Sequence, residues 1–124
     1  MAVEIDQQGA VRIIKMAGQA STQSFSMAFL PEIAAAIDEG LKDNATKAIV
    51  LTGDGRFFSA GADINAFQAS IENNSAPELI RNLTGILHPL LTRIRTSPTI
   101  VVAALNGVSA GGGLGLALAC DARV

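Results

Sequence analysis

Two continuous apolar runs, each followed directly by a glycine-rich segment, constrain the fold of this chain more than any other feature. Ala48–Thr52 precedes the segment GDGRFFSAGA at 53–62. Ile100–Leu105 precedes Asn106–Gly113, and five of the chain's 12 glycines lie in or just after that second segment. A short apolar run bounded by turn residues is typical of a strand buried on both faces, as in a parallel sheet with helices packed against it. Ligands bind at the carboxyl ends of such strands, so both glycine-rich segments are candidate ligand loops.

Shorter patterns predict the elements around these strands. Two β-rich runs, Val3–Ile5 and Val11–Met16, flank a turn that contains Gly9 and predict a hairpin. Apolar residues at helical spacing predict three helices. The first runs from Ser26 or Pro31 to about Leu41. The second runs from Pro77 to Arg95, with a bend at Pro89. The third covers Leu114–Cys120, which is apolar all round, so we expect it to be buried.

The order of these elements indicates an α/β fold. Strands that alternate with helices imply right-handed crossovers and a largely parallel sheet. The two strand-to-helix loops, Ser59–Asp63 and Gly107–Gly113, are then expected at the same edge of that sheet. Each loop exposes backbone N–H groups and lets a ligand approach closely. Two such loops that face one another would make a two-donor site for an oxyanion, where each donor is worth about 3–4 kcal/mol to a transition state.

Composition excludes several functional classes. A chain of 124 residues with 49% hydrophobic and 16% charged residues fits one domain at most, and neither a disordered segment nor a coiled coil. A net charge of −2 argues against a nucleic-acid partner. A single cysteine, Cys120, excludes a disulfide framework and a zinc site of four thiolates, and no other metal site is expected. The chain shows no secretory signal and no membrane-spanning run, so we expect a soluble, cytoplasmic protein.

Two motifs together resemble one known family. The segment Phe58–Ile64 reads FSAGADI, and Asn106–Gly113 reads NGVSAGGG, followed by Ala-Cys-Asp at 119–121. In this order the motifs resemble the enoyl-CoA hydratase/isomerase (crotonase) family over nearly the whole chain. The resemblance implies a crotonase-like fold of repeated β-β-α units with a mainly parallel sheet. It also implies an acyl-CoA thioester substrate and fatty-acid-type chemistry, with coenzyme A carried as part of the substrate and no separate cofactor.

The resemblance also assigns candidate site residues. The backbone N–H groups of Ala62 and Gly112 match the two oxyanion-hole positions that stabilise a thioester enolate. The neighbouring residues are expected to contact the substrate, in particular the CoA adenine moiety. They are Ala60, Gly61, Asp63, Ile64 and Gly111.

Two departures from the family pattern bear on the site. Hydratases of the family carry a glutamate where this chain has Gly115, and a backbone position cannot act as a general base. Isomerase-type chemistry, in which a single acid moves the proton, is therefore slightly favoured over hydration. The acid expected for that role would lie one strand and one loop beyond Gly115, outside this chain. The loop Gln23-Ser24-Phe25 replaces the family's Asn-Ala-Leu, which leaves its CoA contacts open.

The extent of the chain is a further departure, because the family's domain normally continues well past Val124. We therefore expect residues 1–124 to be the N-terminal part of a truncated crotonase-like domain. The remainder would complete the active site and build a homo-trimer or hexamer. For these residues alone we expect little or no activity.

Two other functions compete with this interpretation. The sequence Gly107–Gly111 fits G-x-S-x-G, which would make Ser109 the nucleophile of a serine hydrolase. Such an enzyme needs a histidine after the serine, and none follows Ser109, so we expect Ser109 to be a small turn residue. The second alternative is a non-catalytic fragment that binds CoA.

Four more side chains invite a functional interpretation. His88, the single histidine, falls on the polar side of its helix between two arginines, which favours a solvated face or an oligomer contact. Thioester dehalogenases, one branch of the resembled family, place a histidine on a comparable helix. Asp63 is expected to cap a helix, Asp121 to make structural hydrogen bonds and Cys120 to be a buried small hydrophobe.

Overall fold

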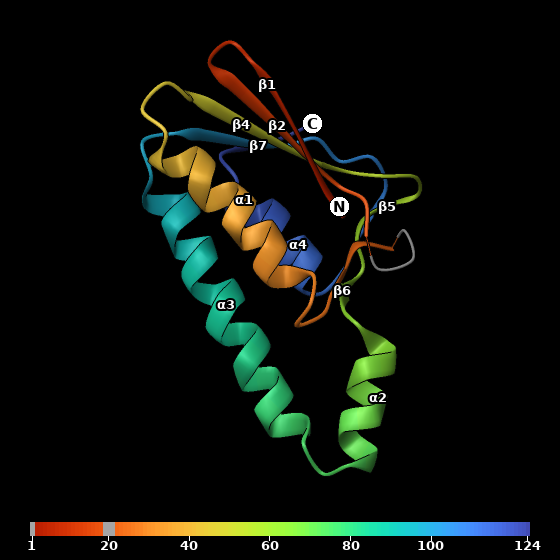
Figure 1. The fold of residues 1–124 in the computed structure, drawn as a ribbon. Coiled ribbons are helices and arrows are strands. Elements are labelled where there is room, and N and C mark those ends of the chain that lie inside the picture. The colour runs from red at the N-terminus through yellow and green to blue at the C-terminus, as the bar shows by residue number, and fades with distance from the viewer. Residues whose placement is uncertain (1, 19–21) are drawn as a thin grey trace.

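A five-stranded sheet forms one layer of the computed structural model, which describes residues 2–18 and 22–124, and helices lie against one of its faces (Figure 1). Every neighbouring pair in the sheet is parallel except the first, β1–β2. The predicted mainly parallel α/β architecture is therefore present. The strands in spatial order are β1 (Val3–Gln8), β2 (Val11–Met16), β4 (Ala48–Gly53), β7 (Ile100–Ala103) and β9 (Ala122–Arg123).

The predicted hairpin is confirmed. Strands β1 and β2 pair antiparallel from Val3 opposite Met16 to Gln8 opposite Val11. Gly9 in the turn has φ +61°, a conformation that favours glycine. β1 continues beyond Ile5, the predicted end, because its exposed polar residues still pair with β2. This pairing depends on the partner strand, so the local sequence of β1 does not reveal it.

Burial of the central strands on both faces was predicted and is wrong. Along β4, Ile49, Leu51 and Gly53 are buried, while the residues between them are only partly covered. In β7, Val101 and Ala103 are buried and Ile100 is 56% exposed. Helices of this chain lie against one face alone, so the apolar side chains on the other face retain contact with water.

Helix α1 (Leu30–Lys42) begins one residue before Pro31, the later of the two predicted starts. Proline suits the first turn of a helix because its missing N–H has no partner there. The Ser26 hydroxyl accepts a hydrogen bond from Phe29 N–H at 3.0 Å and so shapes the turn before the helix. The fully buried residues Leu30, Ile33 and Ile37 form the stripe that packs against the sheet.

The second predicted helix is present as α3 (Ala76–Thr96), one element that continues through Pro89. Its C-terminal half is packed, since Leu87, Leu90 and Ile94 are buried. Arg93 donates to both carboxylate oxygens of Asp38 on α1, at 2.8 and 3.0 Å, and this pair fixes α3 beside α1.

Helix α2 (Ile64–Glu72) precedes α3, and the sequence indicated it only through the expected cap at Asp63. Its apolar residues Ile64, Phe67 and Ile71 are exposed, and Ser70 is its one buried residue. Figure 1 shows α2 and the first half of α3 extending together away from the sheet. None of the helices in the described ranges is both long enough and apolar enough to cross a membrane.

The two glycine-rich segments contain short strands, although they were predicted to be loops throughout. β5 (Phe57–Ser59) pairs parallel with β8 (Val108–Ser109), and β3 (Ser24–Phe25) pairs parallel with β6 (Gly61–Ala62). Helix α4 (Gly112–Ala119) begins among the glycines as predicted. It is not buried all round, because Leu114 and Leu118 are 45% and 57% exposed.

Candidate functional site

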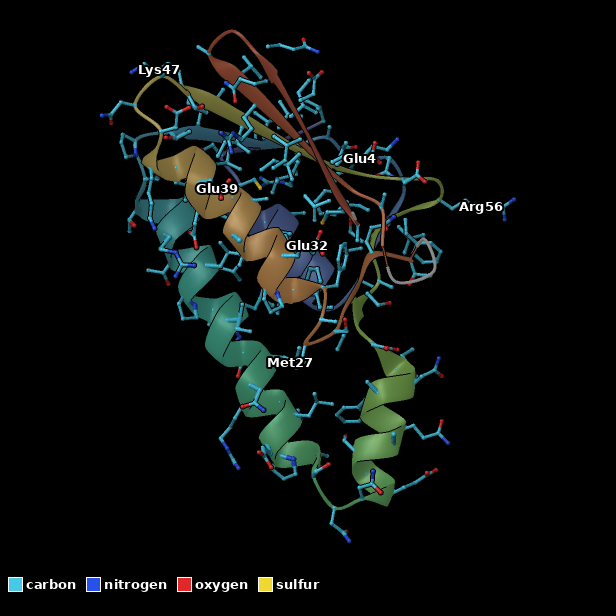
Figure 2. The ribbon with its side chains drawn as sticks, in the orientation of Figure 1. Glu4, Met27, Glu32, Glu39, Lys47 and Arg56 are labelled. Atoms are coloured by element: carbon cyan, nitrogen blue, oxygen red, sulfur yellow. The ribbon has the colours of Figure 1, made fainter. Side chains whose placement is uncertain are left out.

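The pairing of β5 with β8 brings the two glycine-rich segments together. Ser59 lies opposite Ser109 in this pair, and Ala110 N–H donates to the Ser59 carbonyl at 3.0 Å. Lys47 and Arg56, labelled in Figure 2, flank the two ends of β4, and the segments meet at the Arg56 end. This is the carboxyl edge of the parallel strands, so the prediction that both loops share one sheet edge is confirmed.

Gly61 is one of the points where the two segments approach closely. Its φ is +85°, and a Cβ placed on it would lie 2.7 Å from Ala110 O and 3.0 Å from Gly112 N. Real Cβ atoms do not come that near a backbone atom, so a side chain at this position would push the segments apart. Gly61 therefore places Ala62 next to the start of α4.

The Ala62 N–H points away from β3. Asp63 N–H donates to Phe25 O on β3 at 3.4 Å, and neighbouring amides of an extended strand point in opposite directions. The Ala62 N–H is therefore directed away from β3, while the adjoining Gly61 lies against the start of α4.

The Gly112 N–H is a second donor beside it. In the first turn of α4, Gly113 and Leu114 donate to Ala110 O, and Gly115 donates to Gly111 O. The Gly112 N–H finds no acceptor among residues 2–18 and 22–124. A helix N-terminus also favours negative charge, so this amide is suited to an oxyanion.

Ala62 and Gly112 both line a cavity of about 260 Å³ between β3, α2 and α3. Thr84 and His88 contribute polar groups, and among the described residues His88 is its only ionisable lining residue. His88 was predicted to lie on a solvated face or at an oligomer contact. It is exposed, but the structure also puts it on the cavity wall. The apolar lining residues are Phe25, Leu30, Phe67, Ile80, Leu83 and Leu87.

A second hollow, of about 500 Å³, adjoins the first at Ala62. Ala60, Asp63 and Ile64, three of the residues assigned to substrate contacts, line it together with Ala62. Gly61 is buried between the glycine segments, and Gly111 precedes α4 with φ +53°. Neither of these two glycines lines a hollow; both shape the backbone next to the two donors.

Three polar or acidic candidates have other surroundings. Asp63 caps α2 through a 3.0 Å hydrogen bond from Asn65 N–H, and Asp121 accepts a 2.8 Å bond from Val101 N–H, both as predicted. The Ser109 hydroxyl is buried, has no hydrogen-bond partner within the described part of the chain, and does not border the cavity that His88 lines. A hydrolase nucleophile needs a base beside it, so Ser109 does not fit that role.

Cys120 is a buried thiol that donates to Leu116 O at 3.3 Å. Burial, and next the charge of Asp121, raises the pKa of Cys120 to about 11. This agrees with the prediction of a buried small hydrophobe. Across residues 2–18 and 22–124, no three His, Cys, Asp or Glu side chains gather as metal ligands.

Sequence reasoning missed the polar side chains that hold the glycine segments. Ser59 and Gln23 are both 0% exposed, and Asn106 accepts from Gly53 N–H at 2.9 Å and donates to Gly55 O and Phe57 O. The sequence pattern marked Gln23 only as a departure from the family and Ser59 only as part of a motif. For Ser59 the available signal was a polar residue directly after Phe57 and Phe58 in a strand-forming run, whereas Gln23 stands among polar residues and carries no such signal.

Comparisons with known proteins agree with this geometry. The sequence profile of the enoyl-CoA hydratase/isomerase family matches residues 6–124. A Bacillus subtilis protein named "Probable enoyl-CoA hydratase" is 37% identical over 101 residues, which are 82% of this chain and 38% of that protein. A Mycobacterium tuberculosis protein named "Probable enoyl-CoA hydratase echA14" is 37% identical over 93 residues, or 75% of this chain and 34% of that protein.

The fold agrees with solved structures as well. The crystal structure of an enoyl-CoA hydratase from Bacillus anthracis superposes with a TM-score of 0.85 at 28% identity, covering 99% of this chain and 46% of that one. The chain thus spans less than half the length of each of these relatives. Its predicted crotonase-like fold is confirmed. Motifs, fold and matches together show that the chain belongs to the enoyl-CoA hydratase/isomerase family.

Proposed function

We propose that this chain supplies the carbonyl-binding half of an enzyme that acts on acyl-CoA thioesters. One observation carries the proposal: Ala62 lies at the junction of an apolar cavity and a second hollow, beside the unpartnered Gly112 N–H. A thioester joins an apolar acyl group to a large polar carrier. The acyl group would occupy the apolar cavity, the CoA portion the second hollow, and the thioester the junction.

The two backbone amides act on the charge that develops at the thioester oxygen. When a proton leaves the carbon next to the carbonyl, negative charge moves to that oxygen as an enolate. Amides fixed by the fold need no reorganisation when the charge forms, so they stabilise the enolate more than the neutral thioester. One such donor is worth about 3–4 kcal/mol to the transition state.

The residue at position 115 bears on the fate of the enolate. Gly115 lies in the first turn of α4 and carries no group that could activate water. We therefore favour migration of the double bond, in which one acid or base returns the proton to another carbon, over hydration. His88 is the first residue to test as that proton carrier, since it borders the apolar cavity.

Turnover of defined thioesters tests the proposal. The protein encoded by the full reading frame is expected to convert a 3-enoyl-CoA to the 2-enoyl isomer faster than it hydrates a 2-enoyl-CoA. His88→Gln is expected to lower kcat for isomerisation by about tenfold or more, because general acid–base catalysis contributes at least that much. Labelling of Ser109 by a fluorophosphonate would support the hydrolase instead. Binding of acyl-CoA without any turnover would support a binding module.

A further inference from the structure

A buried serine ties together the two segments that carry the proposed donors. Ser59 is 0% exposed and lines neither hollow, so it cannot touch a substrate there. Its hydroxyl donates to the Gln23 carbonyl at 2.8 Å and accepts from Gly61 N–H at 3.1 Å. Its own carbonyl accepts from Ala110 N–H at 3.0 Å. One residue thus bonds to both glycine segments.

The start of α4 rests on the same residue. A Cβ placed on Gly113 would lie 2.6 Å from Ser59 Cβ and 2.8 Å from Ser59 Oγ. Glycine at 113 therefore lets the first turn of α4 pack directly on the serine. Ser59 therefore contacts both the Gly61 amide, which precedes Ala62, and the first turn of α4, which carries Gly112.

Gln23 anchors this serine from the opposite side. Gln23 has φ +52°, a strained conformation for a residue with a side chain. Its Oε1 accepts from Gly18 N–H at 3.0 Å, and its Nε2 donates to Asp54 O and Phe57 O at 2.9 and 3.1 Å. These bonds fix the carbonyl that receives the Ser59 hydroxyl and offset the backbone strain. The strain therefore lies next to the proposed site.

We propose that Ser59 is a positioning residue that sets the separation of the Ala62 and Gly112 amides, and that Gln23 supports it. The inference rests on the proposed function, because it concerns the same two donors. Loss of the Ser59 hydroxyl frees the Gly61 N–H and lets the Ala60–Gly61 peptide turn, which shifts the next peptide, the one that carries the Ala62 N–H. A displacement of about 1 Å in a catalytic group can lower a rate about a hundredfold.

The test compares Ser59→Ala with a matched loss of a buried hydroxyl elsewhere. Thr46 is 3% exposed, donates to Asp43 at 2.8 Å and lies beside Lys47, at the other end of β4, so Thr46→Val is the control. Ser59→Cys retains a weak donor of similar shape and is expected to rescue part of the loss. The readouts are kcat, KM, melting temperature and the infrared stretch of a ¹³C-labelled thioester carbonyl in the bound state.

Ser59→Ala is expected to lower kcat about tenfold to a hundredfold with KM changed far less, and to move the carbonyl band back toward its value in water. Thr46→Val is expected to lower the melting temperature without moving kcat or the band. The inference is overturned if Ser59→Ala binds acyl-CoA with the wild-type band and kcat, or if Thr46→Val lowers kcat equally. If the wild-type protein does not shift the carbonyl band at all, the proposed function fails and the inference falls with it.

Discussion

Replacement of Gly112 by proline removes one proposed donor while leaving the helix start compatible with the new residue. Gly112 is the first residue of α4, a position where proline is well tolerated because its N–H has no partner in the helix. A Cβ on Gly112 would lie 3.0 Å from Leu87 Cδ2 and 3.2 Å from Phe25 Cδ2, so these side chains must shift slightly in any variant that adds a Cβ here. Proline differs from alanine at this position in losing the N–H and in carrying a ring carbon on the nitrogen.

Gly112→Ala is the matched control, because it adds the same Cβ and keeps the N–H. Loss of one oxyanion donor is expected to lower kcat by about 10²–10³, or about 3–4 kcal/mol. Gly112→Pro is thus expected to turn over an enoyl-CoA at least about a hundredfold more slowly than Gly112→Ala. Circular dichroism and melting temperature establish that both variants fold. A folded Gly112→Pro protein with a kcat within a factor of about three of the alanine variant would exclude the Gly112 amide as a donor to the transition state.

Three further substitutions or titrations probe the structure around the site and elsewhere. Gly61→Ala is expected to destabilise the fold more than Gly9→Ala, because both have positive φ but only Gly61 has backbone atoms around its missing Cβ; equal changes in urea midpoint would contradict this. Cys120 is expected to react with iodoacetamide about a hundredfold more slowly in the folded protein at pH 8 than an ordinary thiol, because burial raises its pKa from 9.0 to about 11. The unfolded thiol loses its proton first as the pH rises, so stability is expected to fall between pH 9 and 11, and Cys120→Ala should remove that dependence. The hydrogen bond from Thr46, and next that from Ala45 N–H, lowers the pKa of Asp43. Thr46→Val is expected to raise that pKa toward its usual value in a carboxyl NMR titration, and an unchanged pKa would disprove the assignment.

Local patterns predicted the elements that are rich in apolar residues. Continuous apolar runs beside turn residues marked β4, β7 and α4, β-rich runs marked the hairpin and an apolar stripe marked α1, so each could be placed within a few residues. The extent of α2 was not predicted, because beyond the expected cap at Asp63 its nine residues offer few large apolar positions. Leu114 and Leu118 are exposed, which shows that the apolar composition of α4 did not predict which of its faces other elements bury.

At the site, sequence motifs suggested the two proposed backbone donors but not the side chains that support them. Ala62 and Gly112 come from motifs that are local in sequence. The role of Ser59 depends on its pairing with Ser109, 50 residues along the chain, and on the contact with Gln23. His88 is exposed as predicted, and it also borders the cavity that α3 forms with α2, a contact that the local pattern of α3 does not reveal.

The position of a bound thioester oxygen decides whether Ala62 and Gly112 form an oxyanion hole. A crystal structure of the protein with a non-reactive acyl-CoA would show that oxygen relative to the two backbone amides. We expect it to lie about 2.7–3.1 Å from both Ala62 N and Gly112 N, with the acyl group beside Phe67 and Leu87. An acyl-CoA bound with its thioester oxygen away from both amides would contradict the proposed function.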